Sequence, residues 1–187
     1  MRSFIAIEVP DNIKTAIEEL SGRLRASGTK ASWVKPDNIH LTLRFLGSIE
    51  ERRVNLISER LNIEYRDVAP FTLRVSGVRT FPNVHKPSVV WVGLEPAEGP
   101  LAVTQEIAET AAIATGFPRE TKPFRAHMTV ARIRNKLKLG NLIEALESEK
   151  DFSTEPFTVD TVALFSSDLT RNGSIYTKLG EFQLCKT

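Results

Sequence analysis

The chain has 187 residues, of which 41% are hydrophobic and 26% charged, and its formal net charge is +2. This length supports one substantial hydrophobic core, and this composition is that of an ordinary globular protein, with no long biased tract that would indicate disorder. No run approaches the roughly 18 apolar residues of a membrane span, and the opening MRSFIAIEVPDN reaches charged and turn residues too early for a signal peptide. We therefore expect a cytoplasmic protein with no membrane contact.

The first half of the chain predicts the element order β-α-β-α-β. FIAIEVP, ending at Pro10, IHLTLRF around His40 and FTLRVSGV from Phe71 predict strands. Apolar residues at helical spacing predict helices over residues 12–27 and 51–61.

The second half repeats this order. VVWVGLEP ends 86 residues after FIAIEVP, AHMTVAR places its histidine 87 residues after His40, and FTVDTVAL begins 86 residues after FTLRVSGV. Helices are predicted over 100–114 and 141–149. We expect an internal repeat of about residues 1–80 and 87–165.

The chain closes with an expected hairpin. Asn172-Gly173 lies between two extended patterns and predicts a tight turn, with a last strand over 174–184 that pairs with 158–165. The whole pattern predicts an α+β protein with a single bilobal domain, 1–187. Its two quasi-symmetric halves would be related by an approximate two-fold axis, with antiparallel sheets facing a central groove.

The two repeated histidines are the candidate catalytic residues. Strand alternation puts His40 and Thr42 on one face, with Leu41 and Leu43 turned to the core. The second motif does the same with His127 and Thr129. A lone motif of this kind is usually a solvated strand face, but only three histidines occur, and two of them recur beside the same hydroxyl residue. His85 has no counterpart and is expected to be solvated.

Acid and base catalysis suits this pair better than metal binding. Two histidines without a third ligand make a poor zinc site, no acidic cluster suggests magnesium, and Cys185 is the single cysteine. We therefore expect no metal and no cofactor. Imidazole titrates near neutrality, so one ring can accept the proton of an attacking water while the other protonates a departing sugar oxygen. The threonine hydroxyls would bind the non-bridging phosphate oxygens.

The motifs HLTLRFLG and HMTVAR resemble the paired H-x-T-x motifs of the two-histidine phosphoesterase superfamily, in particular its RNA 2′,3′-cyclic phosphodiesterase branch, historically called 2′-5′ RNA ligases. WVKPDNIHLTLRFLG, the FPN loop and the SxLxxxGSIYxxL ending extend the resemblance over essentially the whole chain. Ala126 departs from it, because proline is expected there. The resemblance implies that His40 donates a proton and His127 accepts one, and that the cyclic phosphate is opened to a 2′-phosphomonoester. The same site could use an RNA 5′-hydroxyl in place of water and join the ends through a 2′-5′ linkage.

Substrate contacts are predicted less directly. By alternation Arg44 shares the face of His40, and Arg125 shares that of His127. Phe45 and Phe81 could stack a terminal base, although Phe45 is in phase with the core leucines, which favours packing. Trp33 and Trp91 are expected in the core. Arg132 is off phase in a perfect strand and is included because the resemblance places a substrate contact there.

Two alternatives stay open. The protein could be a non-catalytic module that binds RNA ends, or a phosphodiesterase acting on a small cyclic phosphate metabolite. The weak net basicity, with a pI of about 8.8, leaves the second alternative open, because a protein that grips long RNA is expected to carry a larger basic surface. For the enzyme we expect a monomer whose partners are RNA ends or oligonucleotides with a 2′,3′-cyclic phosphate.

Overall fold

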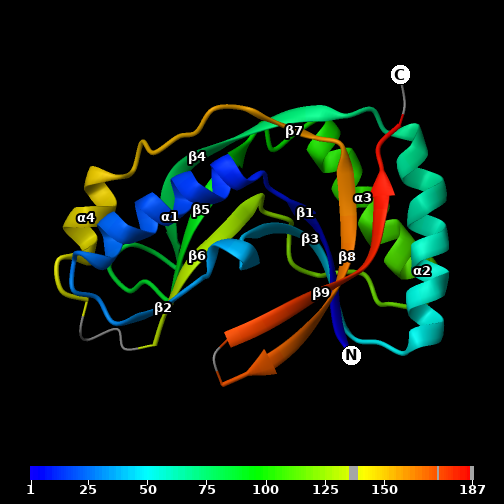
Figure 1. Ribbon diagram of the computed structural model, residues 1–187, viewed down its shortest axis with the longest axis horizontal. Helices are drawn as coiled ribbons and strands as arrows, with labels where there is room; N and C mark the ends of the chain where they lie inside the picture. The colour runs from blue at the N-terminus through cyan, green and yellow to red at the C-terminus, as the bar shows by residue number, and fades with distance from the viewer. Residues whose placement is uncertain (135–138, 172, 186–187) are drawn as a thin grey trace.

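The computed structural model describes residues 1–134, 139–171 and 173–185. Its strands form two antiparallel sheets that lie on either side of the molecule (Figure 1). The four-stranded sheet has the order β3 (His40–Ser48), β1 (Arg2–Glu8), β8 (Thr161–Thr170) and β9 (Gly173–Gln183). The five-stranded sheet has the order β2 (Ala31–Trp33), β6 (His127–Ile133), β5 (Val89–Glu95), β4 (Phe71–Phe81) and β7 (Phe157–Val159). The predicted α+β fold class is confirmed.

Helices cover the outer face of each sheet (Figure 1). The helical elements are α1 (Asp11–Arg25), α2 (Glu51–Glu64), α3 (Pro100–Ala114) and α4 (Leu142–Ser148), with short 3-10 turns η1 (Pro36–Asn38) and η2 (Tyr65–Asp67). Helix α1 packs on β6 and α4, whereas α3 packs on β3 and α2. The apolar spacing that predicted the helices explains this packing, since Ile13, Ile17, Leu20 and Leu24 bury one face of α1. No described helix combines the length and apolar character needed to cross a membrane.

The two halves of the chain are interlocked. Strands β1 and β3 of the first half share a sheet with β8 of the second, whereas β5 and β6 share a sheet with β4 of the first. The helices cross over as well, because α1 lies on the sheet that contains β6 and α3 lies on the sheet that contains β3. Two sheets were correctly expected, but neither sheet belongs to one half alone.

Strands β4 and β7 meet at the junction between the halves. Phe71 pairs with Val159, Thr72 with Thr158, and Leu73 with Phe157. Thr72 therefore lies opposite the residue 86 positions later, which is its own counterpart in the repeat. An antiparallel pair in which equivalent residues face each other is the arrangement that a local two-fold axis produces.

The C-terminal hairpin forms, but the strand that pairs with β9 lies later in the chain than predicted. Strand β9 pairs with β8 from Gln183 opposite Thr161 to Gly173 opposite Thr170. The extended pattern that begins at Phe157 is split at Asp160, so that β7 joins one sheet and β8 the other. Gly173 has a φ of 114°, which glycine adopts without strain. Asn172, the other half of the predicted turn, lies outside the described residues.

Candidate active site

His40, Thr42, His127 and Thr129 line one hollow between the sheets, which we call the central hollow. Its volume is about 530 Å³. Strand β3 supplies the first histidine and threonine and β6 supplies the second pair, while the intervening Leu41 and Met128 are fully buried on the opposite faces. The structure thus brings together the two motifs that the sequence singles out.

Both imidazole rings are held in the same way. The Nδ1 atom of His40 lies 2.8 Å from the carbonyl oxygen of Asn38, and that of His127 lies 2.7 Å from the carbonyl oxygen of Arg125. A carbonyl oxygen only accepts, so each Nδ1 carries a proton and each Nε2 is left for proton transfer. Nε2 of His40 is 3.0 Å from Oγ1 of Thr42, whose hydroxyl can donate to it.

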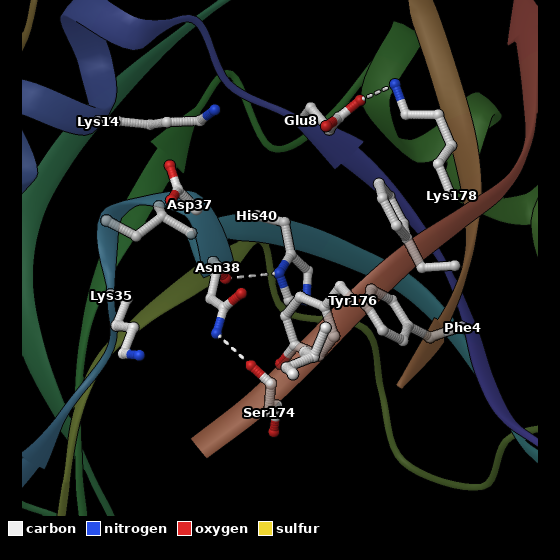
Figure 2. Close-up of a pocket in the computed structure, with 13 residues that line it drawn as sticks. Phe4, Glu8, Lys14, Lys35, Asp37, Asn38, His40, Ser174, Tyr176 and Lys178 are labelled. Carbon is white, nitrogen blue, oxygen red and sulfur yellow. Dashed lines mark hydrogen bonds and ion pairs between the residues drawn. The ribbon is translucent and has the colours of Figure 1, made fainter. Parts of the chain in front are cut away.

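Aromatic side chains pack around each histidine. The ring of His40 stacks on Phe4 with centroids 4.7 Å apart and meets the edge of Tyr176 at 5.2 Å (Figure 2). His127 makes edge contacts with Phe81 at 5.4 Å and Trp91 at 5.7 Å. These contacts fix the ring orientations. Sequence reasoning missed Phe4 and Tyr176, although the alternation of Tyr176 with Ser174 and Lys178 along the last strand was available as a signal.

The environment of His40 lowers its pKa. Burial is the largest cause, because an imidazolium is poorly solvated there, and the charge of His127 acts in the same direction. The hydrogen bond to the Asn38 carbonyl and the charge of Glu8 oppose this effect without cancelling it. In the free protein His40 is therefore biased toward its neutral form.

A β-bulge in β3 reverses the predicted alternation. Ala6 of β1 pairs with Thr42 and the next residue, Ile5, pairs with Arg44, so Leu43 is an extra residue in the ladder. Beyond this point, the side chain of Arg44 is only 8% exposed, whereas Phe45 is 61% exposed. The predictions that Arg44 shares the face of His40 and that Phe45 packs with the core leucines are both wrong, because alternation assumes an unbroken ladder.

Arg44 is held by protein groups. Its guanidinium forms an ion pair with Glu109 of α3, with Nε 2.5 Å from Oε2, and donates to the carbonyl oxygens of Phe45 and Pro118. Glu109 also accepts a hydrogen bond of 2.7 Å from the backbone N–H of Glu120. Arg44 thus ties β3 to α3 and to the segment that leads into the second histidine motif.

A second bulge brings Arg132 to the groove. Trp91 of β5 pairs with Thr129 and Val90 pairs with Ala131, so Val130 is the extra residue. Arg132 is exposed and lines the central hollow. It is the third residue after Thr129, as Phe45 is the third after Thr42, so the two occupy equivalent positions in the repeat.

The groove continues beyond each histidine. The His127-side hollow, of about 690 Å³, is lined by Phe45, Phe81 and Arg125, and the guanidinium carbon of Arg125 lies 5.7 Å from the Phe81 ring centroid. The His40-side hollow, of about 450 Å³, is shown in Figure 2. The predicted core position is right for Trp91, whereas Trp33 is only partly buried and lines the central hollow.

The central hollow is cationic. Arg2, Lys35 and Arg132 line it, and no carboxylate among the described residues does. Sequence reasoning missed Arg2 and Lys35. Within the described ranges, no three His, Cys, Asp or Glu side chains are grouped so that they could hold a metal ion. The site thus offers two proton carriers, two hydroxyls and positive charge to an anionic substrate.

Comparison with known proteins identifies relatives over the full chain. Residues 7–91 and 92–176 each match the family described as LigT like phosphoesterase. An RNA 2′,3′-cyclic phosphodiesterase of Archaeoglobus fulgidus is 37% identical over 191 positions, covering 98% of this chain and 100% of the relative. A Thermotoga maritima protein of the same name is 33% identical over 183 positions, covering 98% and 95%.

Solved structures agree with these relatives. A Thermus thermophilus protein superposes with a TM-score of 0.80 at 28% identity, covering 99% of this chain and 98% of that one. The structure of E. coli LigT without ligand gives a TM-score of 0.79 at 22% identity, covering 97% and 96%. At 22% identity, the match to E. coli LigT shows only that the two proteins share a fold.

Proposed function

Because this chain belongs to the LigT like phosphoesterase family, we propose that it hydrolyses the 2′,3′-cyclic phosphate at RNA ends to a 2′-phosphomonoester. The observation that carries this proposal is the presence of both H-x-T motifs in one cationic hollow, each histidine with its Nδ1 on a carbonyl oxygen. Because the carbonyl oxygens occupy both Nδ1 atoms, both Nε2 atoms are left for proton transfer.

In the proposed mechanism His127 removes a proton from water as the water oxygen bonds to phosphorus. The bond from phosphorus to the 3′ oxygen breaks on the opposite side, and His40 protonates that oxygen. The phosphate stays on the 2′ oxygen. Thr42 and Thr129 donate to the non-bridging oxygens, whose negative charge increases in the transition state, and Arg132 adds a fixed positive charge. Arg125, Phe81 and Phe45 line the adjoining hollow as further substrate contacts.

Substrate binding would favour protonation of His40, the proposed proton donor. The lowered pKa of His40 favours its neutral form in the free protein. A phosphate anion beside the ring favours the imidazolium and therefore raises that pKa. On protonation Nε2 of His40 becomes a donor, so its hydrogen bond with Oγ1 of Thr42 would reverse and free the hydroxyl proton of Thr42 for the phosphate. Proton donation is thereby coupled to the presence of the anion.

The same site would support ligation. If an RNA 5′-hydroxyl replaces water beside His127, His127 removes its proton, the 5′ oxygen bonds to phosphorus, and the 3′ oxygen leaves and is protonated by His40, which gives a 2′-5′ linkage. The His127-side hollow provides space for the nucleoside that carries this hydroxyl. The supply of RNA 5′-hydroxyl ends decides whether hydrolysis or ligation prevails.

We infer that residues 1–187 work as one bilobal domain, as a monomer, in the cytoplasm, without metal or cofactor. A module that only binds RNA ends would retain cyclic-phosphate RNA without product over hours. An enzyme for a small cyclic metabolite would show a shallow dependence of affinity on salt, since few phosphates are contacted.

The central experiment is to incubate the protein with RNA that ends in a 2′,3′-cyclic phosphate and to determine by NMR which oxygen retains the phosphate. We expect the 2′-phosphate, formed equally with EDTA present. A 3′-phosphate product would contradict the assignment of the leaving oxygen, and loss of activity that a divalent ion restores would contradict the metal-free mechanism.

Single substitutions test the two histidines. His40→Ala and His127→Ala are each expected to lower kcat by about 10² to 10⁴ fold, the usual contribution of one general acid or base. Circular dichroism would check that the fold persists. His85→Ala is the matched control and should retain full activity, because His85 lines none of the three hollows. Full activity in either active-site variant would remove that histidine from the mechanism.

A further inference from the structure

The groove is longer than one nucleotide requires. The central hollow shares His40, Lys35 and Asn38 with the His40-side hollow, and it shares Thr42 and His127 with the His127-side hollow. Volumes of about 450, 530 and 690 Å³ are each within the range of small-molecule sites. Space is therefore available for substrate on both sides of the scissile phosphate.

Most cations of the two outer hollows already have carboxylate partners. In the His127-side hollow Arg44 pairs with Glu109, and Arg119 lies 3.8 Å from Glu106. In the His40-side hollow Nζ of Lys178 lies 2.5 Å from Glu8 and 2.6 Å from Glu181, and Lys14 lies 3.3 Å from Asp11. These pairs reduce the positive charge that is left for an anionic ligand.

Lys35 differs from these cations. It lines both the central and the His40-side hollow, and no carboxylate of the described residues lies within 4.0 Å of its ammonium group. Its side chain is exposed, so a ligand can reach it without displacing protein groups. Lys35 is thus an unpaired positive charge where the groove passes His40.

The backbone beside Lys35 is fixed. Lys35 precedes η1, and the side chain of Asn38 in that turn donates a 2.8 Å hydrogen bond to the carbonyl oxygen of Ser174 in β9 (Figure 2). The carbonyl oxygen of the same Asn38 holds the His40 ring. Lys35 therefore lies next to a short turn that is hydrogen-bonded both to the ring of His40 and to strand β9 of the hairpin.

In-line displacement gives the direction of the RNA. The leaving 3′ oxygen lies at His40, opposite the attacking water, so the ribose of the terminal nucleotide lies on the His40 side. The next phosphodiester toward the 5′ end is attached to that ribose. We propose that Lys35 forms a subsite for this second phosphate and makes the enzyme prefer an oligonucleotide to a nucleoside 2′,3′-cyclic phosphate. The inference rests on the function proposed above.

The test compares a dinucleotide that ends in a 2′,3′-cyclic phosphate with the corresponding nucleoside cyclic phosphate. Lys35→Met is expected to lower kcat/KM for the dinucleotide by about 10-fold, the usual effect of a charged hydrogen bond, and for the mononucleotide by less than about 2-fold. Lys35→Arg should keep the preference. The slope of log(kcat/KM) against log salt for the dinucleotide should become shallower by about 0.7 in Lys35→Met, since one phosphate contact is lost.

Two variants serve as controls. Lys86→Met removes an exposed lysine that lines none of the three hollows, and both substrates should be unaffected. Arg2→Met removes a cation of the central hollow beside Ser48, at the end of β3 remote from His40, and its effect should not depend on substrate length. Equal losses on both substrates in Lys35→Met would overturn the proposal, as would a length-dependent loss in Arg2→Met alone.

Binding measurements separate this inference from the proposed function. Calorimetry would give the Kd of the dinucleotide 2′-phosphate and of the nucleoside 2′-phosphate for the wild type and Lys35→Met. If the wild type turns over neither cyclic substrate, the proposed function fails, but a loss of affinity confined to the dinucleotide still supports the subsite. If both products lose affinity equally, or neither does, the subsite does not exist.

Discussion

At the scale of single residues, the two histidines have similar backbone contacts but different surroundings. His40 stacks on Phe4 and is crowded by Tyr176, and burial lowers its pKa. The neutral form of a buried histidine needs less solvation than the charged form, so the shift follows from packing and not from sequence spacing. The histidine that the mechanism needs in its charged form is therefore the one that the free protein keeps neutral.

NMR titration of the imidazole Cε1 proton would measure this shift. We expect His40 to titrate below about 6.5, the value of an unperturbed histidine, and to move upward when a nucleoside 2′-phosphate binds. The Tyr176→Ala variant should also raise the value, because it opens the ring to water. A free protein in which His40 titrates above 6.5 would contradict the burial argument.

The same shift links folding to pH. The unfolded chain protonates His40 before the folded chain does, so this residue favours folding fully above about pH 6.5. Its contribution declines as the pH falls from there through the lower pKa of the folded state. Urea unfolding at several pH values should show this decline in the wild type, and His40→Gln should lack it.

Strand alternation predicted residue positions correctly up to a definite point. It placed His40 with Thr42 and His127 with Thr129 because these residues precede the bulges. It failed at Arg44 and Phe45, since Leu43 adds one residue to the ladder. No glycine or proline marks this bulge in the sequence, and the partner that draws Arg44 inward, Glu109, is far away along the chain. Long-range partners of this kind cannot be predicted from local pattern.

At the scale of elements, the buried pair of Arg44 and Glu109 joins β3 to α3. The two side chains are 8% and 4% exposed, so removal of either partner leaves an uncompensated charge away from water. Arg44→Met is expected to lower the free energy of unfolding by about 3–5 kcal/mol. The measurement is equilibrium unfolding in urea, monitored by circular dichroism.

The control for this prediction is Arg74→Met. Arg74 and Glu95 also form an ion pair, with a separation of 3.7 Å, but they are 53% and 51% exposed. Loss of such a surface pair costs at most about 1 kcal/mol. The double variant Arg44→Met with Glu109→Leu should recover part of the lost stability, because it leaves no unpaired charge. If Arg44→Met is no more destabilising than Arg74→Met, the buried pair does not join these elements.

Helices were easier to predict than strand partners. The helix predicted over 100–114 matches α3, and the other three are within a few residues of their observed ends, because apolar spacing is a local property. The partner of the last strand was placed too early since the sequence around Asp160 reads as one extended run. The change of sheet at that residue depends on β4, which pairs with β7.

At the scale of the whole molecule, the interlocked sheets make each half depend on the other. Residues 1–86 contain β1 and β3 without β8, and residues 87–187 contain β5 and β6 without β4. Each fragment would also leave the apolar faces of its helices uncovered. We expect neither fragment to fold alone, because neither can bury a core of sufficient size.

Production of the two fragments separately would test this dependence. Amide hydrogen exchange and near-ultraviolet circular dichroism should report little fixed tertiary structure in each, and a native-like spectrum should appear when the fragments are mixed. The intact chain should unfold in one cooperative transition. A fragment that protects its amides by itself would show that the halves are independent domains.

Phe45 and Arg132 occupy equivalent positions in the repeat but differ in chemistry, and this difference affects the direction in which a nucleic acid strand can bind. A pair of identical subunits would have to display the same side chain at both places, and a ligand could then enter in either sense. Since one continuous polypeptide carries both motifs, a residue that follows one motif can change in evolution while the equivalent residue after the other motif stays the same. Phe45 and Arg132 both line the central hollow, so a ligand there meets an aromatic ring after one motif and a guanidinium after the other, and the protein can distinguish the two ends of a nucleic acid strand.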